Sequence, residues 1–293
     1  MNAKPMRMTA RMNIPDAGFQ FPRSSQHWRE YFRNNAASLL HIPWESGVSL
    51  TNDERKSIAV SVQQFQLGES SDGHHFLYAA REHALAGGDA QYVPALRRLI
   101  AEEQRHGRDL GRVLDLAGIE RIHHAWADTI FRWLRRQAGL ELSISILVTA
   151  EIIAQVYYLA LRDATGSLVI GRLCDQILRD EDEHVRFQCE RLAILRRGQR
   201  PWRVILKHAS QRCFFYGTCL VFWMTHAPVM RAGGFGFIAF LRTARRKLRI
   251  AMRMMDPRRY RFPEAPSGSK EEPRNPITPT ADPLDLSGKW LDL

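Results

Sequence analysis

The sequence predicts an all-α protein, and three observations support this class. From residue 52 onward, apolar residues recur with the 3.6-residue period of amphipathic helices. No run of alternating β-branched residues is long enough to argue for a sheet. Glycine- and proline-containing breaks separate the periodic stretches. The expected helices are 53–86, 92–117, 123–137, 139–163, 168–197, 202–226 and 234–255.

The chain has 293 residues, 45% of them apolar, which is enough to bury a substantial core. We expect an N-terminal arm over 1–50 with one short helix around 25–40, followed by a helical bundle over 51–199. Additional apolar and basic helices are expected over 200–255. Prolines are too frequent after that to continue a helix, so we expect a Pro-rich extended tail over 256–293.

The cysteines and the N-terminal region indicate a cytoplasmic protein. Cys174, Cys189, Cys213 and Cys219 lack C-x-x-C spacing and the density of a disulfide framework, which is typical of reduced structural thiols. The first 50 residues lack a charged start followed by an apolar stretch and a small-residue cleavage site. A secretory signal is therefore not expected.

Two short motifs each set a carboxylate and an imidazole three residues apart, namely Glu103-Gln-Arg-His106 and Glu181-Asp-Glu-His184. The apolar positions of each predicted helix define a buried face, and the same phase passes through both members of each motif. One such motif alone is more often a solvated helix face. Two copies, both in phase with the core, indicate a metal-binding bundle.

Each motif also has a carboxylate upstream. Glu151 is the only charged residue in 142–161, where an unpaired carboxylate would cost roughly several kcal/mol unless protonated, paired or bound to metal. By length this stretch also allows a membrane span, but a central glutamate favours a bundle helix.

Three glutamates are candidates for the upstream carboxylate of the first motif. Glu69 precedes Glu103 by 34 positions, close to the 30 that separate the second pair, which suggests an approximate twofold repeat. Glycine and serine residues around Glu69 are poor helix formers. Glu54 and Glu82 are therefore alternatives for this position.

The complete pattern is Glu…Glu-x-x-His, twice, and it predicts a site for two metal ions held by Glu69, Glu103, His106, Glu151, Glu181 and His184. Carboxylate and imidazole ligands without thiolates suit iron, or manganese in one or both positions, better than structural zinc. Glu102 and Asp180 immediately precede the motif glutamates, where each can accept the ring N–H of the histidine from the other half.

Over about residues 52–198 this pattern resembles the ferritin-like di-iron carboxylate superfamily. That superfamily includes rubrerythrins, the small subunit of ribonucleotide reductase, acyl-carrier-protein desaturases and di-iron monooxygenases. The resemblance implies a ferritin-like four-helix bundle with a long crossover, which would contain the short helix at 123–137, plus extra C-terminal helices.

The resemblance also implies roles for the ligands. Glu103 and Glu181 would bridge the two metals, Glu69 and Glu151 would be terminal ligands, and the two histidines would complete the coordination. Tyr157 and its neighbour Tyr158 follow Glu151 closely; we expect them to pack in the core, with a redox-active tyrosine as the alternative.

In function, the resemblance implies an oxidoreductase that activates O₂ to hydroxylate, desaturate or N-oxygenate a small, hydrophobic organic substrate, with electrons from an external donor. Two histidines fit oxygen-activating members better than ferritin. One alternative is a ferroxidase or peroxide-detoxifying protein without organic substrate. Another is a structural or membrane-binding bundle whose ligands are vestigial.

The region after the bundle combines an uncharged apolar segment, 213–230, with a basic segment, 242–261, which supplies +8 of the net charge of +11. This combination fits peripheral contact with an anionic membrane through 213–261. The alternative is two helices that cover the bundle and present a basic solvated face. Nucleic-acid binding is disfavoured because no aromatics are interleaved with base-reading residues.

Overall fold

The computed structural model describes residues 21–124 and 139–262, and within these ranges the chain is helical and contains no β-strand. The all-α class is therefore confirmed for this part of the chain. The predicted helix at 123–137 and the predicted tail fall almost entirely outside the described residues. The elements are α1 (Ser25–Ala36), α2 (Asn52–Glu69), α3 (His74–Leu85), α4 (Tyr92–Leu116), α6 (Leu140–Asp163), α7 (Leu168–Leu195), α8 (Pro201–Ala232) and α9 (Phe237–Met254), with single 3-10 turns at Trp44–Ser46 and Pro257–Arg259.

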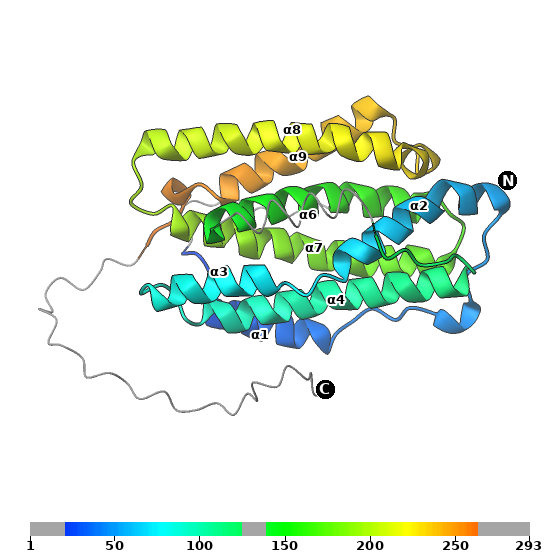
Figure 1. The fold of residues 1–293 in the computed structure, drawn as a ribbon, viewed down its shortest axis with the longest axis horizontal. Helices are drawn as coiled ribbons and strands as arrows, with labels where there is room; N and C mark the ends of the chain where they lie inside the picture. Colours follow the sequence, from blue (N-terminus) through cyan, green and yellow to red (C-terminus); the bar gives the residue numbers. More distant parts are fainter. Residues whose placement is uncertain (1–20, 125–138, 263–293) are drawn as a thin grey trace, which may run out of the picture. The chain divides into compact units, whose positions relative to one another are not determined.

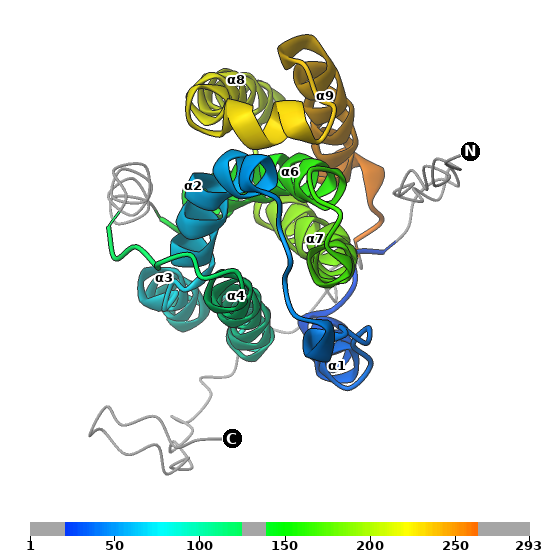
Figure 2. The ribbon, with the colours of Figure 1, turned by 90° about the vertical axis from the view of Figure 1, so that its right-hand side faces the viewer.

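The core is a bundle built from two helix pairs (Figures 1 and 2). α6 packs along α7 and α2 packs along α4, and the two pairs meet where α4 contacts α7. α3 lies against both α4 and α6. α8 and α9 cover the other side of α6, and α9 also contacts α7. α6 is apolar on all sides because other helices surround it, as expected for a fully buried helix.

Within the described ranges, two helices, α6 and α8, are long and apolar enough to cross a membrane by length and composition alone. They differ in burial within the protein. The apolar window of α6 is 83% buried, whereas that of α8 is only 33% buried. Burial in the core therefore explains the apolar composition of α6, whereas α8 keeps an apolar face outside the core.

The prediction of one continuous helix over 53–86 was wrong, because the helix breaks between α2 and α3. Gly73 has a φ of +64°, a left-handed conformation that favours glycine. The break lies against α4, where a Cβ on Gly107 would stand 2.6 Å from the Ser70 hydroxyl oxygen. The poor helix formers after Glu69 thus permit a turn that the close approach of α4 accommodates.

The predicted end of the next-to-last helix, at 226, is also too early. α8 continues to Ala232 and includes Pro228 within its last turns. A proline in a helix removes one backbone hydrogen bond, yet the following turn can be kept when tertiary packing stabilises it. Val229 and Met230 are fully buried here and provide that packing.

The predicted short helix in the N-terminal arm is present as α1, which packs on α4. Its Trp28 and Phe32 are almost completely buried and form ring contacts with each other and with Phe187 of α7. The described residues up to Arg261 form one compact unit. The segment borders at 50, 199 and 255 stay predictions of the sequence.

Candidate metal centre

The helices of the bundle bring all six predicted ligands together. Glu69 ends α2, Glu103 and His106 lie on α4, Glu151 on α6, and Glu181 and His184 on α7. They form two overlapping groups, in each of which one potential ligand atom per residue lies within 4.8 Å of the others. The groups are Glu69, Glu103, His106, Glu181 and Glu103, Glu151, Glu181, His184.

Glu103 and Glu181 belong to both groups, so the arrangement has the form expected of two adjacent cation sites with shared carboxylates. Oε1 of Glu181 lies 3.8 Å from Nδ1 of His106 and 4.0 Å from Nδ1 of His184. The assignment of each residue as a ligand stays a prediction, but the geometry that it requires is present.

The hydrogen bonds of the cluster leave its inward atoms free for a cation. Both histidine Nδ1 atoms and one oxygen each of Glu103, Glu151 and Glu181 are buried without a hydrogen-bond partner. Buried polar atoms are otherwise nearly always paired. The 2.8 Å contact between His184 Nδ1 and Glu103 Oε1 lacks hydrogen-bond geometry. This convergence of unpaired oxygen and nitrogen atoms, without thiolate, fits two iron or manganese ions.

Each histidine is oriented by a carboxylate from the other half of the site. Nε2 of His106 lies 3.0 Å from Asp180 Oδ2, and Nε2 of His184 lies 2.9 Å from Glu102 Oε2. When each Nε2–H donates to its carboxylate, the Nδ1 lone pair points inward, which is the tautomer that a metal ligand needs.

The sequence did not point to Asn35 of α1, which joins these two outer carboxylates. Its side-chain NH₂ donates to Glu102 Oε1 and to Asp180 Oδ1, both at 2.8 Å. Arg105 also donates to Asp180, at 2.5 Å. The aromatic composition of the arm indicated that it packs on the bundle, but no local signal marked this asparagine.

Burial disfavours the ionised form of most carboxyl groups in the cluster. Desolvation, followed by the charge of Glu103, raises the pKa of Glu69, Glu151 and Glu181 well above the usual range. Burial acts in the same direction on Glu103, but contacts with His184 outweigh it and lower the pKa of Glu103 to about 2. Cations that replace protons here would relieve the repulsion among the three buried carboxylates and the partly exposed Glu103.

The structure also distinguishes Glu69 from the two alternative glutamates, Glu54 and Glu82. Tyr158 donates its hydroxyl hydrogen to Glu69 Oε1 at 2.7 Å. Glu54 instead caps the start of α2, where it accepts from the Thr51 and Gly166 N–H groups. Glu82 is exposed on α3. Of the three candidates, Glu69 is the one that reaches the cluster.

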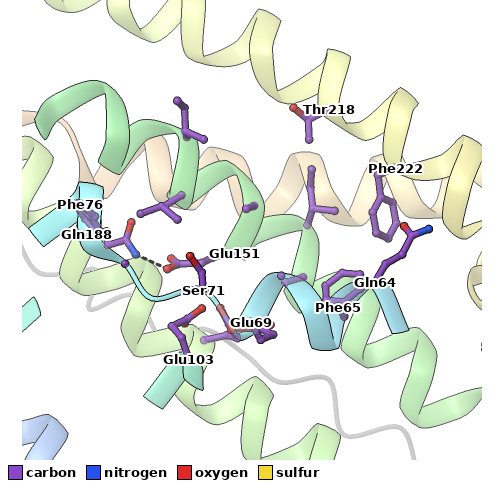
Figure 3. A pocket seen from close by; sticks show the side chains of 18 of the residues that line it. Gln64, Phe65, Glu69, Ser71, Phe76, Glu103, Glu151, Gln188, Thr218 and Phe222 are labelled. Carbon is purple, nitrogen blue, oxygen red and sulfur yellow. Dashed lines mark hydrogen bonds between the residues drawn. The ribbon is translucent and has the colours of Figure 1, made fainter. Parts of the chain in front are cut away.

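A cavity of about 260 Å³ lies directly beside the carboxylates (Figure 3). Glu69, Glu103, Glu151 and Glu181 form part of its wall. The remaining wall is mainly apolar and comes from α2, α3, α4, α6 and α8, with Gln188 from α7 and Ser71 from the α2–α3 turn. It includes Phe65, Phe76, Leu99, Ile100, Ile146, Ile153, Ala154 and Phe222, with Gln64, Thr218, Thr225 and His226 as polar members.

Comparison with solved structures identifies the architecture. The chain is similar to two variants of an R2-like ligand-binding oxidase, each with an aerobically reconstituted Mn/Fe cofactor. Both matches have a TM-score of 0.55 and cover 80% of this chain, with 16% and 15% sequence identity over 95% and 94% of those chains. The fold is ferritin-like.

The predicted ferritin-like bundle is thus confirmed, with α2, α4, α6 and α7 carrying the cluster and α8 and α9 as extra C-terminal helices. No family model and no curated protein matches the chain. At identities this low the likeness supports the ferritin-like fold, and the activity has to be argued from the site itself.

Proposed function

We propose that this protein is an oxidoreductase that holds two iron ions, or one manganese and one iron, and uses O₂ to oxidise a small hydrophobic molecule. The observation that carries the proposal is that the apolar cavity and the cluster share four carboxylates. A molecule in the cavity would therefore stand next to the cations. The Mn/Fe cofactor of the structurally similar oxidases supports this choice of metals.

When bound, the metal pair would supply the reduction of O₂, and the surrounding residues have separate tasks. Glu103 and Glu181 belong to both candidate ligand groups and would be shared by the two cations. Tyr158 restrains Glu69 through its hydrogen bond, and Gln188 restrains Glu151 in the same way. Apolar walls exclude water from the reacting molecule.

The cavity wall indicates how a substrate is oriented. In Figure 3, Gln64 and Phe222 lie toward α8, on the other side of the cavity from Glu103 and Glu151. His226 adds a polar group to the wall, and burial lowers its pKa to about 4, so it is neutral at physiological pH. An apolar substrate with one neutral polar group fits this distribution.

Two further parts of the proposal concern the cell. The sequence contains no flavin or ferredoxin motif, so electrons would come from an external donor. Cys174, Cys189 and Cys219 are buried as free thiols, which supports the predicted cytoplasmic location.

The test is O₂ consumption by the metal-loaded protein with and without medium-chain alkyl alcohols and acids, with product identification by mass spectrometry. We expect two metal ions per chain and substrate-dependent O₂ uptake. Ala154→Phe places a large ring in the buried cavity wall and should abolish substrate oxidation while two metals are retained. Ala101→Phe, at an exposed position on α4, is the matched control.

Two other results would favour the alternative function, that of a ferroxidase or peroxide-detoxifying protein without organic substrate. If O₂ uptake depended on ferrous iron alone, and many iron atoms per chain accumulated, the protein would be a ferroxidase. Turnover of peroxide without any organic product would indicate a detoxifying protein.

A further inference from the structure

The outer face of α8 carries a row of exposed apolar side chains. Trp202, Leu206, Leu220 and Met224 are between 54% and 83% exposed. Trp202 and Leu220 are 18 residues apart, which is five helical turns, and the other two follow each of them by about one turn. These four side chains therefore form a line that extends about 33 Å along the helix.

The neighbouring helix α9 adds a row of positive charge. Its buried side packs on α6, α7 and α8, and its other side consists mainly of exposed arginines. These are Arg242, Arg245, Arg246, Arg249 and Arg253. Over 201–255 the chain contains ten basic residues and no acidic residue, so no carboxylate on these helices neutralises the row.

Both rows face the same way. α8 and α9 lie side by side (Figure 2), joined by ring contacts of Trp223 with Phe237 and Phe240. Both helices bury their inner sides against α6. The apolar row and the arginine row therefore point away from the bundle together, and we call them the α8–α9 outer face.

The cavity reaches the surface next to this face. Its wall includes exposed Gly68 on α2 and exposed Val221 on α8, so its rim lies between these helices. Val221 directly follows Leu220 of the apolar row, and Met224 stands one turn further on. If an apolar phase covered the outer face, a molecule leaving that phase beside Leu220 or Met224 would be within about one helical turn of the cavity rim.

We propose that the α8–α9 outer face docks on an anionic lipid bilayer and that the substrate enters the cavity from that bilayer. A bilayer surface matches both rows, because anionic headgroups attract the arginines while the apolar row enters the headgroup boundary. A row of exposed apolar side chains beside arginines that have no carboxylate on their own helices suits this phase boundary better than a folded partner, whose surface would have to supply matching carboxylates. The entry route, but not the docking, rests on the proposed function.

The docking is tested by co-sedimentation of the metal-loaded protein with vesicles of phosphatidylcholine alone or mixed with phosphatidylglycerol. We expect binding to the mixed vesicles and its release by high salt. Met224→Asp and the double variant Arg245→Glu/Arg249→Glu should each weaken binding by at least about tenfold. The controls are Leu85→Asp, with the same 83% exposure as Met224, and Arg97→Glu/Arg98→Glu on α4.

Three results would overturn the docking. They are equal binding to both vesicle types, no binding to either, and salt-resistant insertion. A wild-type dimer that Met224→Asp converts to a monomer would assign the face to a second copy of the chain.

Entry of the substrate from the bilayer is tested separately with the docking variant Met224→Asp. Its oxidation of a probe carried in vesicles should fall, while its oxidation of the same probe dispersed in detergent should persist. If the wild-type protein oxidised the probe in neither form, the proposed function would be contradicted, but the co-sedimentation result on docking would still stand.

Discussion

Glu151 lies in the middle of α6, an otherwise apolar helix, and its contacts explain how the fold tolerates it. The Gln188 side-chain NH₂ donates to one of its oxygens, whereas Oε2 is buried without a partner. Burial, and then the charge of Glu103, raises the pKa of Glu151 well above its ordinary value of 4.5. The residue is thus arranged for a proton or a cation at Oε2.

Replacement of Glu151 by glutamine should affect the metal-free and metal-loaded proteins in opposite ways. A raised folded-state pKa contributes stability that is fully present below pH 4.5 and is lost as the pH rises through the folded-state pKa. Glu151→Gln cannot ionise, so it should stabilise the metal-free protein by on the order of 1–3 kcal/mol at about pH 8, with little effect at about pH 4.

The measurement is urea unfolding of the metal-free protein at both pH values, together with metal analysis. The variant should bind fewer than two metals per chain. Glu82→Gln, at an exposed position on α3, should change neither quantity. Full metal content in Glu151→Gln would show that this residue is not a ligand.

At the scale of elements, α1 belongs to the metal centre although it lies outside the repeated motifs. Asn35 is the contact point, because its NH₂ lies between Glu102 and Asp180. These two carboxylates hold the two histidines. α1 therefore orients both imidazoles through these carboxylates, and its Phe32 ring also packs edge-on against the His184 imidazole, at 5.9 Å between ring centroids.

Asn35→Ala should loosen this arrangement. Loss of the shared donor leaves two buried carboxylates facing each other, and we expect a destabilisation of about 1–3 kcal/mol. Metal affinity should fall by about 10–100-fold, as for other residues that support metal ligands. Metal titration and urea unfolding test this, with exposed Asn34→Ala as the control. Unchanged affinity would limit Asn35 to a structural role.

The break between α2 and α3 places Glu69 at the end of a helix and brings Ser70 against Gly107 of α4. Glycine to alanine inside a helix normally stabilises by about 0.5–1 kcal/mol. In Gly107→Ala the new Cβ would stand 2.6 Å from the Ser70 hydroxyl oxygen and 3.0 Å from its backbone nitrogen.

We therefore expect Gly107→Ala to reverse the usual sign and to destabilise by about 1–3 kcal/mol, because the turn must shift. Gly171→Ala in α7, where a Cβ would meet nothing within 4 Å, should instead stabilise. Thermal unfolding of the two variants gives the comparison. Stabilisation of both would mean that the α2–α3 turn adapts freely.

At the scale of the whole molecule, the cluster joins α2, α4, α6 and α7 at one point. In the metal-free protein these carboxyl groups disfavour one another's ionised form, and this repulsion opposes the packing of the four helices as the pH rises. Metal binding would convert this repulsion into attraction between helices that are distant in sequence.

Removal of the metals should consequently destabilise the entire bundle. A ligand that binds only the folded state at a hundredfold excess over its Kd contributes about 2.7 kcal/mol per site. Calorimetry before and after chelation, followed by re-addition of ferrous iron, measures the effect. The stabilisation should shrink as the pH falls, because protons compete for the carboxylates. His184→Ala protein should respond much less, and an unchanged response would argue against metal at this cluster.

Much of the candidate site follows from local periodicity. Glu103, His106, Glu181 and His184 were placed inside because their helices continue the same apolar phase above and below them. Glu151 followed from being the only charge in an apolar stretch. Helix phase repeats every few residues, so short segments contain enough information to predict which side chains are buried.

By itself, the sequence determined the helical class, the buried phase of the long helices and the residue types of the centre. Only the tertiary structure decided between Glu69 and its rivals, placed Asn35 beside residues 67 and 145 positions away, and left the apolar row of α8 uncovered. The physical reason is range. Periodicity reports which face of a helix is apolar, whereas the packing of distant segments determines what covers that face.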